Sequence, residues 1–203
     1  MISPMVDFRG ADGWLYRLAG RRVQRLAPPE PPTAGAILEQ ARPLADKNAN
    51  AADLQVRRIR RGPKRSYAED YDPWERLYDC EFLIGALWRF RSAVRVAENV
   101  PGIAPQVILL IKRFDDSLPA LRKMRNVLEH ADEYGVDAHH FNRRKASHPD
   151  VHRQQVQVMS WDEDSMTWLG ATVNYDYALE AVAECYEGLK NILESWHPTI
   201  PPP

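Results

Sequence analysis

Hydrophobic positions recur at helical spacing along most of the second part of the chain. Asp72 followed by Pro73 is a typical helix start, because an aspartate caps the first turn and proline is tolerated at the first helical position. Pro119 either kinks a helix or opens a new one, and Gly135 is a typical C-terminal stop. The pattern predicts a mainly α protein, a bundle of long antiparallel helices over residues 72–99, from 105 through 114, 121–134 and 175–196.

A different pattern separates the third and fourth of these segments. Residues 155–158 alternate apolar and polar side chains, residues 162–165 form a polar turn, and residues 166–173 offer a return strand. Alternation with period two around a polar turn is typical of a β-hairpin. We expect one β-hairpin insertion at about 155–173.

The first third of the chain carries a weaker pattern. Residues 8–27 read as a short helix, and the four prolines of residues 28–32 end it. Thr33 can cap a modest helix that we expect Pro43 to interrupt, and residues 48–71 show no convincing periodicity. The sequence therefore predicts two parts: residues 1–70 as an irregular N-terminal arm with a Pro-rich linker and a basic run, and residues 71–203 as a helical domain with the hairpin.

Composition and charge narrow the possible functions. Hydrophobic residues make up 44%, which is enough for a packed core. The net charge of −1, from 27 basic and 28 acidic residues, gives no overall attraction to nucleic acid, so such binding must come from local patches. The longest apolar run, residues 107–111, is too short to cross a bilayer, and residues 1–10 lack a signal-peptide pattern. We expect a cytoplasmic protein with no membrane partner, in which Cys80 and Cys185 are buried free thiols.

One group of polar residues suggests chemistry. On a helix over 121–134, Asn126 and His130 are four residues apart on the polar side, and Arg125 lies at its flank beside Glu129. Histidine can transfer a proton near neutral pH, and the planar arginine fork can hold a phosphate. Asparagine can orient either group. This trio suits phosphodiester cleavage, and an ordinary solvated helix face is the alternative.

The segment Arg125-Asn126-Val-Leu-Glu-His130 resembles the R-[polar]-x3-H motif of the HEPN superfamily, the all-helical ribonucleases of toxin–antitoxin and phage-defence systems. The resemblance implies a metal-independent endoribonuclease with Arg125, Asn126 and His130 as catalytic residues. It also implies a homodimer in which both motifs face one cleft, with an RNA substrate and an antitoxin or defence protein as partner. The branch that pairs with nucleotidyltransferase antitoxins has tyrosine two residues after the histidine, where this chain has Asp132.

Two basic segments are candidates for RNA binding. A run in the N-terminal arm and a loop before the hairpin could follow an RNA backbone, although a solvated linker is the plain alternative for the run. Their residues are Arg57, Arg58, Arg60, Arg61, Arg143, Arg144 and Lys145.

Metals and cofactors are not expected. Four histidines gather between residues 139 and 152, but no cysteine lies near them to complete a zinc site. Walker, GxSxG, dinucleotide-binding and HExxH motifs are all missing from the sequence. The competing interpretation of the protein is a non-catalytic helical module that binds another protein.

Overall fold

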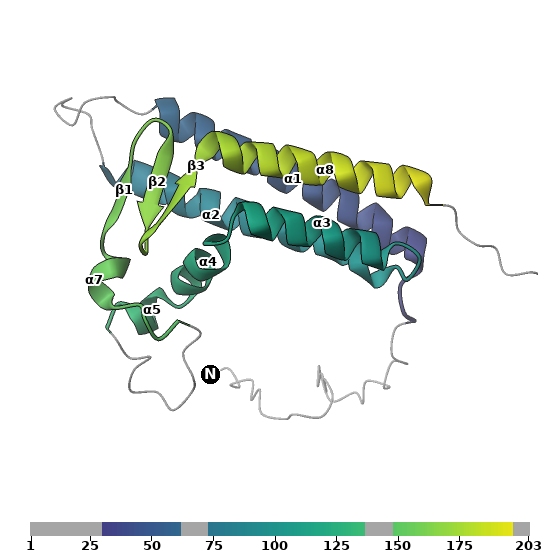
Figure 1. The fold of residues 1–203 in the computed structure, drawn as a ribbon, viewed down its shortest axis with the longest axis horizontal. Coiled ribbons are helices and arrows are strands. Elements are labelled where there is room, and N and C mark those ends of the chain that lie inside the picture. Colours follow the sequence, from purple (N-terminus) through teal and green to yellow (C-terminus); the bar gives the residue numbers. More distant parts are fainter. Residues whose placement is uncertain (1–29, 62–72, 137–147, 197–203) are drawn as a thin grey trace, which may run out of the picture. The chain divides into compact units, whose positions relative to one another are not determined.

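Helices dominate the computed structural model, which describes residues 30–61, 73–136 and 148–196 (Figure 1). In the unit that begins at Thr33, α1 packs against α2 and α8, and α3 packs against α2 and α8. A short 3₁₀ helix and three short α-helices connect these elements. The prediction of a mainly α fold with a small β element is confirmed. The bounds are α1 (Ala34–Arg61), α2 (Pro73–Val96), η1 (Ala97–Asn99), α3 (Ala104–Ser117), α4 (Leu121–Glu129), α5 (Ala131–Tyr134), α7 (Arg153–Val156) and α8 (Tyr175–Ser195).

Helix α1 corrects the expectation of an irregular arm. Its 28 residues continue through Pro43. The proline ring lies on the exposed side of the helix, so the carbonyl that it leaves without a donor can reach water. The opposite side is buried, so α1 is a core helix and the boundary expected at residue 70 is wrong. Its buried residues are Leu38, Ala41, Ala45, Ala52, Val56 and Ile59.

The β element is a three-stranded antiparallel sheet in the order β1 (Met159–Trp161), β2 (Ser165–Trp168) and β3 (Ala171–Asn174). In the first turn the Asp162 carboxylate accepts the backbone N–H of Ser165 at 2.7 Å, and such backbone donors lower the pKa of Asp162. In the second turn both residues have positive φ, 53° for Leu169 and 77° for Gly170. This tight turn provides the third strand, which the sequence pattern did not predict.

The predicted hairpin begins too early. Residues 153–156 form the helix α7, where a strand was expected from residue 155. The backbone N–H of His152 donates to the Gln155 side chain at 2.9 Å, which fixes the first turn of α7. The strand pairing starts only at Met159, opposite Trp168. The cap at His152 therefore favours a helical turn over the strand that the alternating residues 155–158 predicted.

Both cysteines are buried and free, as predicted. Burial raises the pKa of Cys80 and of Cys185 to about 12 in each case. At neutral pH both groups are thiols in the core, and they serve there as small apolar side chains.

Two helical glycines differ in their surroundings and provide a test of the packing. A Cβ added at Gly85 of α2 would meet no atom within 4 Å, whereas one at Gly188 of α8 would lie 2.5 Å from a methyl carbon of Leu110. We expect Gly85→Ala to raise the free energy of unfolding by about 0.5–1 kcal/mol through helix propensity. Gly188→Ala should gain less, because the end of the Leu110 side chain must shift to make room for the new methyl group. Urea denaturation of the two variants measures the difference, and equal gains would contradict the close packing of α3 on α8.

Candidate functional site

The predicted catalytic residues lie at the C-terminal end of α4. Arg125 and Asn126 are half-buried on this helix, which ends at Glu129. His130 follows with φ −116° and ψ 32°, outside the helical region, and α5 begins at the next residue. The single helix expected over 121–134 is therefore wrong: it breaks at His130. The break changes where the imidazole points relative to a straight helix, although the backbone N–H of His130 still donates to the Asn126 carbonyl at 3.2 Å.

Arg125 is held from three sides. Its Nη2 lies 2.5 Å from the Glu129 carboxylate, and its Nη1 donates to Asn126 Oδ1 at 3.1 Å. The guanidinium carbon lies 5.1 Å from the centre of the Trp88 ring, a cation–π contact with α2. The side chain is 29% exposed, while its Nε is buried without a hydrogen-bond partner. Arg125 is thus oriented by its neighbours and only partly buried.

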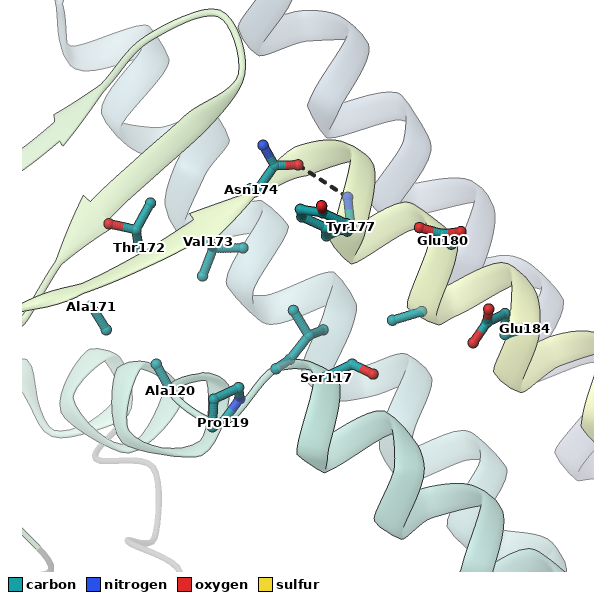
Figure 2. Close-up of a pocket in the computed structure, with 12 residues that line it drawn as sticks. Ser117, Pro119, Ala120, Ala171, Thr172, Val173, Asn174, Tyr177, Glu180 and Glu184 are labelled. Atoms are coloured by element: carbon teal, nitrogen blue, oxygen red, sulfur yellow. Dashed lines mark hydrogen bonds between the residues drawn. The ribbon is translucent and has the colours of Figure 1, made fainter.

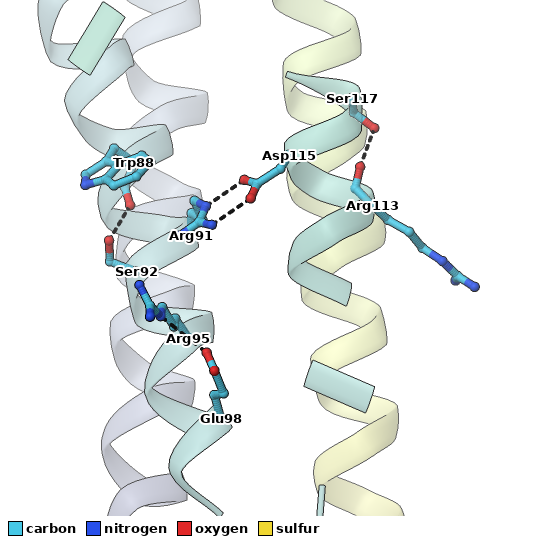
Figure 3. A network of polar contacts seen from close by, with 8 residues as sticks. All are labelled: Trp88, Arg91, Ser92, Arg95, Glu98, Arg113, Asp115 and Ser117. Carbon is cyan, nitrogen blue, oxygen red and sulfur yellow. Dashed lines mark hydrogen bonds and ion pairs between the residues drawn. The ribbon is translucent and has the colours of Figure 1, made fainter. Parts of the chain in front are cut away.

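Trp88 carries a second arginine. Arg91 lies 5.0 Å from the same ring, and its Nε and Nη2 each donate to Asp115 of α3 at 2.6 Å. Figure 3 shows this two-pronged pair joining α2 to α3, with Trp88 one turn before it. The hydrogen bonds to Asp115 raise the pKa of Arg91. Arg91 of α2 therefore binds α3 through Asp115, and Trp88 of α2 contacts α4 through Arg125. These contacts hold Arg125 in a defined position relative to α2.

His148 joins the site from outside the motif. Its Nε2 lies 3.4 Å from Asn126 Nδ2, so the amide can donate to the imidazole when that nitrogen is unprotonated. Burial lowers the pKa of His148, Asp150 opposes this shift, and Lys123 adds to it, so the neutral form is favoured at pH 7. Lys123 is itself bound to Asp150 at 2.7 Å. Two imidazoles, His130 and His148, thus lie near one end of α4.

Sequence reasoning placed Glu129 beside Arg125, four residues later on the same helix. It missed Trp88 and His148 as neighbours of Arg125 and Asn126, because no periodic pattern links them to α4. Each reaches the site only through packing.

The four arginines of the predicted basic run lie near the C-terminal end of α1. Arg57 and Arg61 are both exposed. Arg57 Nη2 lies 2.6 Å from Asp53, a pair within one helix face in which both side chains are about half exposed, 55% and 48%. Such pairs contribute about 0.3–0.5 kcal/mol and leave the charge available to a ligand.

The other two arginines of the run bridge helices. Arg58 Nε lies 2.8 Å from Oδ1 of Asp79 in α2, a side chain that is only 7% exposed. The two atoms form an ion pair, but their geometry does not meet that of a hydrogen bond. Arg60 binds Asp176 of α8 at 2.9 Å and the Glu163 carbonyl at 3.2 Å. Both side chains therefore have structural partners. The other predicted substrate-binding residues, at positions 143–145, lie outside the described residues.

A groove of about 500 Å³ lies elsewhere, between the α3–α4 turn, β3 and α8 (Figure 2). Its floor is apolar, with Leu118 and Val173, and its rim carries Tyr177 and the carboxylates of Glu180 and Glu184. Two carboxylates beside an exposed phenol favour a positively charged group over a phosphate. The carboxylates therefore make the groove unfavourable for an RNA phosphate.

Comparison with models of protein families, with curated proteins and with solved structures finds no match. The resemblance to the HEPN superfamily therefore rests on the six-residue motif alone. Within the described residues, no three His, Cys, Asp or Glu side chains are placed to hold a metal ion. None of the described helices combines the length and apolarity that a bilayer crossing requires.

Proposed function

We propose that this protein is a metal-independent endoribonuclease of the HEPN type. In this proposal His130 transfers a proton, Arg125 holds the scissile phosphate, and Asn126 orients the phosphate or an imidazole. The observation that carries it is the group at the end of α4, where Asn126 contacts the guanidinium of Arg125 at 3.1 Å and the imidazole of His148 at 3.4 Å, four residues before His130. Acid–base cleavage of RNA needs a group that takes the 2′-hydroxyl proton and one that protonates the leaving oxygen.

Glu129 is the competitor that a phosphate must displace. Its carboxylate is 48% exposed, and exposed ion pairs contribute only about 0.2–1 kcal/mol. Glu129 contacts Arg125 through Nη2, and a phosphate oxygen can take the same position. Displacement is therefore inexpensive, while Trp88 keeps the guanidinium in place.

The resemblance also supplies the setting of the proposal. It places the enzyme in the cytoplasm, as a homodimer, in a toxin–antitoxin or phage-defence system with a restraining partner protein. The experiment is incubation of the full-length protein with single-stranded RNA in EDTA, with DNA of the same sequence as the control. RNA should be cut and DNA should not, because DNA lacks the 2′-hydroxyl that attacks the phosphate. Intact RNA at high protein concentration would contradict the proposal.

A second candidate function is a non-catalytic helical module that binds a protein. It is favoured by the contacts of Arg125 with Glu129, Asn126 and Trp88, which also suit a purely structural joint between α2 and α4. The same incubation separates the two, because a binding module leaves RNA uncut.

RNA binding through the basic run has a specific salt dependence. Arg57→Gln with Arg61→Gln should weaken binding of single-stranded RNA and reduce the slope of log K against log salt by roughly 1.4, about 0.7 for each lost phosphate contact. These two positions leave the bridges of Arg58 and Arg60 intact, so the melting temperature should stay nearly constant. Fluorescence anisotropy at several salt concentrations measures the slope. An unchanged slope would remove the basic run from the RNA-binding surface.

A further inference from the structure

Helix α2 exposes three aromatic side chains in a row. Trp74, Tyr78 and Phe82 are 60%, 52% and 61% exposed, and they are spaced four residues apart. Residues at this spacing share one helix face. Single exposed apolar residues are ordinary on a protein surface, whereas a contiguous apolar patch indicates a binding surface.

The same face carries two opposite charges and an open position. Glu75 and Arg89 are exposed, and a Cβ added at Gly85 would meet no atom within 4 Å. At 100° per residue, the three aromatic residues and these three positions fall within an arc of roughly 100°. The buried residues Leu83, Leu87 and Phe90 point away from that arc. We call these six positions the α2 face: Trp74, Glu75, Tyr78, Phe82, Gly85 and Arg89.

The α2 face is complementary to itself. Phe82 is at its midpoint, because Glu75 precedes it by seven residues (82 − 75) and Arg89 follows it by seven (89 − 82). When two copies cross antiparallel with the two Phe82 side chains in contact, each Glu75 lies opposite the Arg89 of the other copy. Tyr78 then falls within one residue, roughly 1.5 Å along the axis, of the open position at Gly85.

We propose that the α2 face is the contact surface of a symmetric, antiparallel homodimer of this chain. Two Glu75–Arg89 pairs flank a central aromatic cluster, and the Gly85 positions receive the Tyr78 rings. A two-fold interface uses one patch twice, so a patch whose charges reverse sign about its own centre is the arrangement it requires. A patch without that reversal would bring like charges together.

The area available indicates a weak dimer. A buried aromatic side chain removes about 150–250 Å² from water, so three that are half to two-thirds exposed offer roughly 300 Å² per copy. Two copies give roughly 600 Å², and the charged rim and helix backbone bring the total to roughly 1,000 Å². That is near the lower limit of specific interfaces. We therefore expect a dissociation constant on the order of micromolar.

The proposed dimer has a consequence for the Arg125 site, although the dimer itself does not rest on the ribonuclease proposal. Trp88 lies about a quarter turn from the centre of the α2 face at 100° per residue. A two-fold axis that relates antiparallel helices leaves lateral residues on the same side. The two Trp88–Arg125 contacts therefore lie on one side of the dimer, next to the interface.

Sedimentation of the full-length protein tests the surface. The wild type should pass from monomer to dimer between roughly 1 and 500 µM. Phe82→Glu places two like charges at the two-fold axis and should raise the dissociation constant at least about tenfold, with an unchanged melting temperature because Phe82 is exposed. The matched control is Ile108→Glu on α3, where the side chain is 51% exposed and lies outside the α2 face. It should dimerise as the wild type does.

Charge reversal tests the register. Glu75→Arg alone and Arg89→Glu alone should each weaken the dimer about tenfold, since each change creates two repulsive contacts. The double variant should return to within about threefold of the wild type, because both pairs re-form with reversed sign. A wild type that stays monomeric at the highest concentration overturns the proposal, even if it binds another protein. Dimerisation unaffected by Phe82→Glu overturns it as well. A monomer that still cuts RNA would reject this dimer and the homodimeric setting, and would leave the ribonuclease activity itself standing.

Discussion

Replacing His130 by alanine is expected to lower RNA cleavage by roughly 10²–10⁴-fold, the usual contribution of a positioned proton-transfer group. His130 is exposed at the break between α4 and α5, so its removal should leave the fold intact. Initial rates of cleavage of a defined single-stranded RNA in EDTA, with the melting temperature of each variant, measure both effects. Arg125→Ala should give a loss of similar size through the phosphate contact.

Two variants make the assignment specific. Asp132→Ala changes an exposed residue two positions away and should cut RNA at the wild-type rate. His148→Ala removes the imidazole that contacts Asn126, and a large loss there would give the site a second proton-transfer group. If His130→Ala cuts RNA as fast as the wild type, His130 is not the proton-transfer residue.

The largest expected loss of stability is at Phe90. This side chain is fully buried in α2, and its ring centre lies 5.5 Å from that of Phe114 in α3, at an interplanar angle of 49°. Phe90→Ala removes the contact and leaves a cavity between the helices. The free energy of unfolding should fall by about 3–5 kcal/mol, measured by urea denaturation.

Phe82→Ala on the same helix is the matched control. Because Phe82 is 61% exposed, its truncation should change the free energy of unfolding of the monomer by no more than about 0.5 kcal/mol. Measurement at a protein concentration well below the expected dissociation constant keeps dimer formation out of the comparison. A cost below about 1 kcal/mol for Phe90→Ala would contradict the packing of α2 on α3.

The periodic pattern determined most of the helical framework. Buried apolar residues recur at intervals of three and four in α2, α3 and α8, as with Leu83, Leu87, Phe90 and Val94 in α2. Such a pattern has few alternatives, because only a helix places these side chains on one face. The two buried thiols and the mainly α class followed from the same reasoning.

Helix α1 shows where local reasoning is insufficient. Ala41, Ala45 and Ala52 are fully buried, but alanine gives little hydrophobic signal, and Pro43 argues against a helix. These small side chains contribute to stability because they let α1 pack closely against α2. Burial against a neighbouring helix offsets a proline cost of about 3 kcal/mol, and sequence spacing does not reveal that neighbour.

The candidate site divides in the same way. The sequence by itself predicted Arg125, Asn126 and His130 as candidates, because the motif lies within six consecutive residues and its chemistry belongs to the residue types. The tertiary structure decided that α4 ends at Glu129, that Trp88 of α2 supports Arg125, and that His148 contacts Asn126. The contacts of Trp88 and His148 join residues that are 22 or more positions apart in the sequence. A local pattern records which residues share a face of one element, while packing between elements determines what that face touches.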